Sequence, residues 1–285
     1  MTSIVRRAAA AILSAISASP TAVALSTVLI AAAAAIFAPP IGAKEAPPPA
    51  QPTVVLVHGA FAESSSWEDV VARLLAKGLP VIAAANPLRG VRSDASYIAS
   101  IVDSIPGPVI LVGHSYGGSV ITNTAVARSN VKALVFVAAF APDAGETAFA
   151  LSGKYPGSTL GPALGPPVTL ADGGKDLYIQ QARYHDQFAA DLPVRVTALL
   201  AATQRPIAEA AGNEPSGPPA WKRIPSWFIY GTADKNIPPA LQTFMAERAG
   251  AKQTVAVDGA SHLVMASHPD QVVQLILDAA GRSAP

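Results

Sequence analysis

Short apolar runs recur along the chain from Thr53 onward, and most of them are rich in β-branched residues. They lack the polar alternation of a strand with one wet face, as expected for strands buried on both faces of a parallel sheet. The pattern predicts strands at Thr53–Val57, Val81–Ala85, Val109–Val112, Ala133–Phe140, Trp227–Tyr230 and Gln253–Val257.

Helical patterns separate these runs, and residues that favour helix ends mark several boundaries. Asp94 is the expected N-cap of one helix, and Gly78 and Gly250 are the expected C-caps of two others. Repeated β-α-β units predict an α/β fold: a doubly wound, mostly parallel six-stranded sheet with helices on both faces. Active residues should then lie at the carboxyl ends of the strands. The expected helices are Trp67–Lys77, Ala95–Ser104, Gly118–Arg128, Pro239–Ala249 and Asp270–Ala280.

The alternation of strands and helices is interrupted between about residues 142 and 225. Residues 152–174 are crowded with glycine and proline, and three helix-like pieces follow. Because this insertion leaves the sheet at the carboxyl ends of two strands, we expect a cap over a site; the alternative is a surface excursion without a role. The helix-like pieces are Leu177–Ala190, Val194–Thr203 and Pro206–Ala211.

The N-terminal segment is typical of an export signal. A pair of arginines precedes the uncharged apolar stretch Ala8–Ala38 and a small-residue cleavage site, so we expect a signal peptide over residues 1–43. Residues 44–52 are then a proline-rich linker and residues 53–285 one folded domain. The expected location is periplasmic or secreted; the alternative is a membrane anchor. No stable membrane partner is expected unless the segment stays uncleaved.

The composition narrows the classes of function. Charged residues make up 14% of the chain and the formal net charge is +1, so no basic patch is available to hold nucleic acid. The absence of cysteine excludes disulfides, thiol catalysis and thiolate metal sites. No metal-ligand cluster is visible in the sequence, and we expect neither a metal nor a cofactor.

The clearest chemical signal is Gly-His-Ser-Tyr-Gly at Gly113–Gly117, between a predicted strand and a predicted helix. A turn this tight strains the serine, and glycine on both sides lets neighbouring backbones approach. It would place the Ser115 hydroxyl above the sheet and the Tyr116 N–H at a helix N-terminus, where negative charge is favoured. Ser115 is therefore the candidate nucleophile; the alternative is an ordinary turn with an incidental serine.

A serine hydroxyl is a poor nucleophile at neutral pH and needs a base. His262 lies just after the last predicted strand and is the candidate base. His114 lies within the glycine-serine motif and is expected to point away from the nucleophile. His185 lies in the cap, where it either lines the pocket or is a solvated lid residue. His58 is expected to be structural, with its ring bonded to nearby backbone.

The base needs a buried carboxylate that orients it and stabilises the imidazolium. Asp234 follows the predicted strand Trp227–Tyr230, again at a carboxyl end, and is the candidate. Asp258 is the competitor, but it precedes His262 on the same strand end. The sequence therefore predicts a Ser-His-Asp triad assembled from three strand ends.

Backbone amides are the candidates for holding the developing oxyanion. The N–H of Ala60, with that of Phe61 as second choice, follows the first predicted strand, where Gly59 lets the chain turn across the top of the sheet. The N–H of Tyr116 would be the second donor. Trp67 is expected to pack the first helix rather than to contact substrate.

Together these motifs resemble the α/β-hydrolase fold superfamily, whose triad follows the chain order serine, acid, histidine. The likeness covers about residues 53–141 and 226–280 and is strongest to the small branch of plant methyl-ester esterases and hydroxynitrile lyases. It rests on His58-Gly59-Ala60 with Trp67, on Gly113–Gly117, on the Asp234 loop and on Ser261–Pro269. The antiparallel hairpin with which that family usually begins has no room here, so we expect an all-parallel sheet.

The resemblance implies a serine hydrolase that cleaves a small-molecule carboxylic ester through an acyl-enzyme. Lyases of this branch carry Lys after the catalytic histidine and Thr after the histidine of the first strand, where this chain has Leu263 and Gly59. Cofactor-free haloperoxidase or lyase chemistry on the same fold stays open as an alternative. So does a non-catalytic protein that binds a small molecule.

The residues expected to line the substrate pocket are mostly aromatic or aliphatic. Such a lining would favour a medium-sized apolar acyl or alcohol group. The candidates are Phe61, Phe140, Tyr184, His185, Trp221 and Leu263.

Overall fold

The computed structural model describes residues 51–281. The expected signal peptide over residues 1–43 lies outside this part, as does most of the linker 44–52, so both stay predictions. Within the described range, no helix combines the length and the apolar character that crossing a membrane requires.

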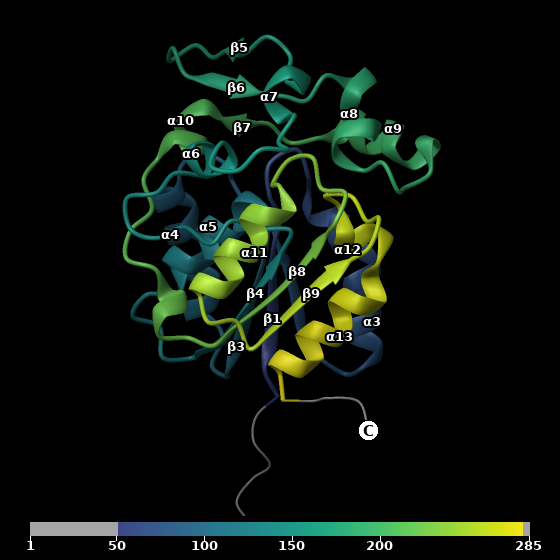
Figure 1. The fold of residues 1–285 in the computed structure, drawn as a ribbon. Coiled ribbons are helices and arrows are strands. Elements are labelled where there is room, and N and C mark those ends of the chain that lie inside the picture. The colour runs from purple at the N-terminus through teal and green to yellow at the C-terminus, as the bar shows by residue number, and fades with distance from the viewer. Residues whose placement is uncertain (1–50, 282–285) are drawn as a thin grey trace, which may run out of the picture. The chain divides into compact units, whose positions relative to one another are not determined.

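A six-stranded sheet, parallel throughout, forms the centre of the fold (Figure 1). Its strand order, β2-β1-β3-β4-β8-β9, shows that the chain winds to one edge and then crosses to the other. This confirms the doubly wound, all-parallel sheet expected from the sequence. The strands are β1 (Thr53–Val57), β2 (Val81–Ala84), β3 (Val109–His114), β4 (Val131–Val137), β8 (Ser226–Gly231) and β9 (Gln253–Val257).

The central strands are apolar because both of their faces are covered. Every residue of β3 is buried, and in β1 only the first residue is not. Their registers place Val57 beside Gly113 and His114 beside Val137. The carboxyl ends of β1, β3 and β4 therefore meet at one end of the sheet, and the residues that follow them are brought together there.

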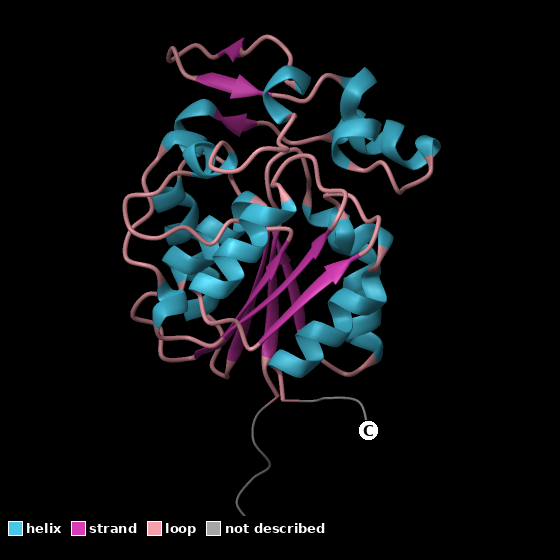
Figure 2. Ribbon diagram, viewed as in Figure 1, coloured by secondary structure: helices cyan, strands magenta, loops and turns pink. Residues whose placement is uncertain are grey.

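Helices cover both faces of the sheet (Figures 1 and 2). Helices α3 and α13 contact one another on one face, and α4, α5 and α11 lie on the other. The helices outside the segment between β4 and β8 are η1 (Ser64–Trp67), α3 (Glu68–Ala76), α4 (Val91–Asp103), α5 (Tyr116–Thr124), α11 (Pro239–Arg248), α12 (Val264–Ser267) and α13 (Pro269–Ala279).

Two of the predicted helix ends are confirmed and one is wrong. Gly78 and Gly250 follow the last turns of α3 and α11 with φ of 76° and 60°, the left-handed conformation that glycine adopts without strain. Asp94 is not an N-cap, because α4 begins a turn earlier and Gly90 holds that position. The side chain of Asp94 instead lies buried inside the fold and accepts the N–H of Arg89.

The fourth strand is displaced from the predicted Ala133–Phe140. Pairing ends at Val137 because Ala138 has a φ of 43°, although its N–H still donates to the carbonyl of Ile229 at 2.7 Å. The apolar run continues because the chain after the strand packs against the turn that follows β3. There the N–H of Phe140 donates to the carbonyl of Ser115 at 3.1 Å.

Most of the residues between β4 and β8, here called the cap, lie above the carboxyl ends of the strands (Figure 1) and contain a three-stranded antiparallel sheet, β5-β6-β7. Residues 220–222 instead contact α5, where the chain returns to the start of β8. The predicted helix Leu177–Ala190 is wrong at its start, which belongs to β6, and the predicted helix Pro206–Ala211 is divided between β7 and α10. Strands of two or three residues are too short to show a period. The cap elements are α6 (Ala148–Ser152), α7 (Leu160–Ala163), β5 (Val168–Thr169), β6 (Lys175–Leu177), α8 (Gln181–Phe188), α9 (Val194–Thr203), β7 (Ile207–Ala208), α10 (Glu209–Asn213) and η2 (Ala220–Lys222).

The loop after β2 ties the cap to the sheet. The Arg89 guanidinium donates to Asp176 of β6 at 2.6 Å and to the carbonyl of Pro206 at 3.2 Å. The carbonyl of Leu88 accepts the N–H of Ala208 in β7 at 3.0 Å. Two of the three cap strands are therefore fixed to this single loop.

Candidate active site

Ser115 occupies the sharp turn between β3 and α5. Its φ of 52° and ψ of −124° are strained for a residue with a side chain. The turn is held by its own backbone, because the carbonyl of Ser115 accepts the N–H groups of Gly118 and Phe140, and its N–H donates to Ala138 at 3.1 Å. This over-determined geometry is the one the Gly-His-Ser-Tyr-Gly pattern predicts.

Glycines 117 and 118 let neighbouring backbone approach the turn. A Cβ on Gly117 would collide with the carbonyl oxygen of Val57, and one on Gly118 would collide with that of Phe140. The first contact locks the turn against the end of β1, and the second locks it against the segment after β4. The serine is thus wedged between the ends of three neighbouring strands.

His262 and Asp234 form a buried pair beside this turn. The Nδ1 atom of His262 lies 2.7 Å from Oδ2 of Asp234, and the two residues are 1% and 4% exposed. The other carboxylate oxygen accepts the N–H groups of Asn236 and Ile237, and Gln242 donates to Oδ2 at 2.9 Å. The carboxylate therefore cannot rotate away from the imidazole.

The second ring nitrogen of His262, Nε2, has no hydrogen-bond partner within the described part of the chain, although it is buried. Because Nδ1 faces Asp234, the carboxylate fixes the tautomer in which Nδ1 carries the proton and Nε2 has a free lone pair. Such a nitrogen can accept a proton from a neighbouring hydroxyl.

His114, which precedes the serine, packs against the His262 ring with centroids 4.8 Å apart. Its Nε2 lies 3.2 Å from the carbonyl of His262 and donates to it. Burial, reinforced by the neighbouring His262, holds the pKa of His114 well below its usual value, so this ring is neutral. The sequence indicated only that His114 would point away from the nucleophile, and it missed this support of the base.

The structure separates the two candidates for the first oxyanion donor. Phe61 is excluded, because its N–H donates to the carbonyl of Arg205 at 2.9 Å. No hydrogen bond among the described residues uses the N–H of Ala60, and none uses that of Tyr116, the first residue of α5. Two free amides therefore flank Ser115, one from the loop after β1 and one from a helix N-terminus.

His58 fixes the loop that carries Ala60, which confirms its structural role. Its Nδ1 donates to the carbonyl of Gly59 at 2.9 Å, and its Nε2 accepts the N–H of Asn86 at 3.0 Å. The Asn86 side chain donates in turn to the carbonyl of His58. Burial lowers the pKa of His58, in keeping with a neutral ring that both donates and accepts.

Aromatic rings from the cap cover the base. The ring centroid of Phe188, in α8, lies 5.0 Å from that of His262 and 6.1 Å from that of Phe61. Tyr184, one turn earlier, packs on Phe188, and its hydroxyl donates to the carbonyl of Phe61 at 2.8 Å. Sequence reasoning named Tyr184 and Phe61 but missed Phe188, although its spacing of four from Tyr184 places the two side chains on one helix face.

The remaining pocket candidates have contacts of other kinds. Nδ1 of His185 lies 3.1 Å from the Thr197 hydroxyl, which ties it to α9, and Trp221 donates to the carbonyl of Pro142 on another side of the cap. Phe140 meets the serine turn through its backbone.

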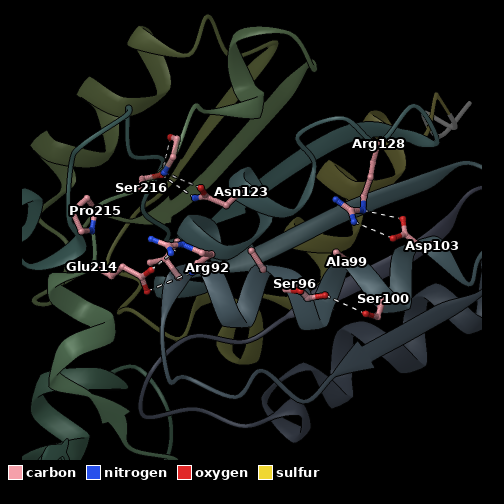
Figure 3. A pocket seen from close by; sticks show the side chains of 13 residues that line it. Arg92, Ser96, Ala99, Ser100, Asp103, Asn123, Arg128, Glu214, Pro215 and Ser216 are labelled. Atoms are coloured by element: carbon pink, nitrogen blue, oxygen red, sulfur yellow. Dashed lines mark hydrogen bonds and ion pairs between the residues drawn. The ribbon is translucent and has the colours of Figure 1, made fainter. Parts of the chain in front are cut away.

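Leu263, directly after His262, lines a cavity of about 260 Å³ between α9 and α12. A second cavity of about 680 Å³ lies elsewhere, between α4, the C-terminal end of α5 and residues 214–217 (Figure 3). None of the three catalytic candidates lines it. Its charged groups are also already paired, because Arg128 bonds Asp103 and Arg92 contacts Glu214.

Comparisons with known proteins show the family and the fold. A family model described as "Alpha/beta hydrolase family" matches residues 54–275. The carbendazim hydrolyzing esterase of Nocardioides sp. (strain SG-4G) is 34% identical over 113 residues, 35% of this chain and 47% of that protein. Putative methylesterase 19 of Arabidopsis thaliana is 27% identical over 265 residues, 81% and 98% of the two chains. The crystal structure of polyneuridine aldehyde esterase shares the fold, with a TM-score of 0.69 and 21% identity over 80% and 99% of the chains.

Proposed function

This chain belongs to the alpha/beta hydrolase family, and we propose that it hydrolyses carboxylic esters, with Ser115 as nucleophile, His262 as general base and Asp234 as the carboxylate that orients the base. The observation that carries the proposal is the buried His262–Asp234 pair, whose free Nε2 lies at the same end of the sheet as a strained serine. The esterase names of the relatives support the same reaction class.

The first half-reaction forms the acyl-enzyme. The oxygen of Ser115 attacks the ester carbonyl carbon while Nε2 of His262 takes the hydroxyl proton. Negative charge then develops on the former carbonyl oxygen, and the free N–H groups of Ala60 and Tyr116 donate to it. The bond to the alcohol breaks, and the imidazolium returns its proton to the leaving oxygen.

The second half-reaction reverses these roles with water as the nucleophile. His262 takes a proton from water, the hydroxide attacks the acyl carbon, and the same two amides hold the second oxyanion. Collapse of this intermediate breaks the bond to Ser115, whose oxygen regains its proton from His262. Asp234 stabilises the imidazolium in both halves.

The surroundings of the site favour uncharged esters with apolar groups. Ser115 is 7% exposed, and the rings of Phe61, Tyr184 and Phe188 stand beside the base. The Tyr184 hydroxyl is occupied by a backbone carbonyl, so this wall offers apolar surface to a substrate. A charged acyl group would lose its hydration there without gaining a partner.

The test is the loss of ester hydrolysis in Ser115→Ala, measured with p-nitrophenyl acetate and butyrate. We expect activity to fall by at least about 10⁴-fold, as in other enzymes that lose the nucleophile. We also expect a fluorophosphonate probe to label the native protein and not the variant. The matched control is Ser119→Ala, one turn along α5, because this buried hydroxyl has no hydrogen-bond partner among the described residues. Native turnover in Ser115→Ala, or equal loss in both variants, would contradict the proposal.

A further inference from the structure

The first turn of α5 has one side chain that can anchor it. Tyr116 begins the helix, and Gly117 and Gly118 follow with no side chain of their own. The N–H of Tyr116 is the donor that an oxyanion would use, so the position of this residue sets the geometry of the hole. A side-chain anchor on Tyr116 therefore acts directly on the chemistry.

That anchor is the carboxylate of Asp94, a group the mechanism does not use. The Tyr116 hydroxyl donates to Oδ2 of Asp94 at 3.0 Å, and both residues are at most 2% exposed. Burial, together with Asp94, raises the pKa of the Tyr116 phenol, so the phenol stays protonated and donates. Burial also raises the pKa of Asp94.

Asp94 is itself fixed from a second direction. The backbone N–H of Arg89 lies 3.1 Å from each carboxylate oxygen, and the hydroxyl of Ser93 donates to Oδ1 at 3.3 Å. The side chain of Arg89 is the one that holds β6 of the cap through Asp176. A chain of hydrogen bonds thus runs from the cap, through the loop after β2, to the residue beside the nucleophile.

We propose that Asp94 is a positioning residue: through the phenol of Tyr116 it holds the Tyr116 amide where the oxyanion forms. The proposal rests on the function proposed above. Without this bond the Tyr116 ring would remain buried, but the first turn of α5 would have no polar anchor on the side facing α4. The amide would then sit less accurately, which costs transition-state stabilisation and not substrate binding.

The experiment compares Tyr116→Phe and Asp94→Asn with the native enzyme. For Tyr116→Phe we expect kcat to fall by about tenfold, less than the about 10²–10³-fold lost with an entire oxyanion donor, while KM stays within about twofold. Affinity for a trifluoromethyl ketone, whose adduct with Ser115 carries an oxyanion, should fall by the same factor. Asp94→Asn keeps an accepting oxygen and should retain more activity than Asp94→Leu. The double variant Tyr116→Phe/Asp94→Leu should lose no more kcat than the worse single variant.

The matched control is Tyr230→Phe, which removes another mostly buried phenol, bonded to Thr243 at 2.7 Å and outside the site. It should lower Tm to a similar extent and leave kcat and ketone affinity unchanged. If folded Tyr116→Phe keeps native kcat and ketone affinity, or if Tyr230→Phe shows the same losses, the positioning role of Asp94 is overturned. Either result leaves the proposed function standing. A native protein that neither turns over esters nor takes the fluorophosphonate label would overturn the proposed function as well.

Discussion

At the scale of single residues, the environment of Asp234 shows how a carboxylate is kept in one orientation. Each of its oxygens has two donors: the amides of Asn236 and Ile237 on one, and Gln242 and His262 on the other. Three of these donors are neutral and come from the loop and helix just after β8. They hold the lone pair that faces the imidazole, so the neutral ring can have only the tautomer with a free Nε2.

We therefore expect Asp234→Asn to leave the fold intact and to abolish most activity. An asparagine that presents its NH₂ to His262 would favour the opposite tautomer, with the proton on Nε2, and kcat should fall by about 10⁴-fold. Steady-state kinetics measure this, with circular dichroism and Tm as checks of folding. Asp258→Asn is the control, because this exposed carboxylate, the competitor in the sequence, bonds only Thr232 among the described residues. Equal losses of kcat in the two variants would contradict the role of Asp234 as the carboxylate that orients His262.

At the scale of elements, the sequence predicts the strands and helices that have a repeating hydrophobic pattern, and it misses elements too short to show one. The strands of the large sheet were found because burial on both faces makes each a continuous apolar run, and Val109–His114 is the clearest case. The cap sheet was missed because β5 and β7 have two residues each and pair only after distant segments meet. Loops also lack a repeating pattern. The serine turn is predicted by its motif, and the Asp234 and His262 loops are predicted by their place directly after strands. The contacts of Phe188, His114 and Asp94 depend on how separate elements pack, which no local pattern records.

The packing of α5 against its neighbours gives a prediction for Gly118→Ala. The added methyl would collide with the backbone oxygen of Phe140, which cannot move without shifting the segment after β4. We expect a loss of about 3 kcal/mol or more in the free energy of unfolding, measured with urea, and a parallel loss of activity. Gly161→Ala in α7 is the control: a Cβ there meets nothing within 4 Å, so stability should stay the same or rise slightly. A stable, active Gly118→Ala would show that the elbow is looser than described.

At the scale of the whole molecule, folding places three imidazoles out of water at one end of the sheet. His58, His114 and His262 are each at most 1% exposed, and no described acidic side chain bonds the first two. A neutral imidazole serves these places well, since it can donate with one nitrogen and accept with the other. As a consequence, the stability of the fold depends on pH, because the unfolded chain binds protons at these rings more readily than the folded chain does.

We expect the protein to lose stability as the pH falls below about 6.5, the value from which burial lowers the pKa of both His58 and His114. Below that pH the unfolded state takes up a proton at each ring before the folded state does, so the free energy of unfolding decreases. The limit is about 1.4 kcal/mol per pH unit for each histidine. The raised pKa of Asp94 acts in the opposite direction, because the folded chain binds that proton more readily than the unfolded chain does. Urea unfolding between about pH 7.5 and 5.5 measures how steeply the free energy of unfolding changes with pH. His114→Gln should make the pH dependence shallower, and an equal dependence in this variant and in the native protein would mean that His114 is not held neutral.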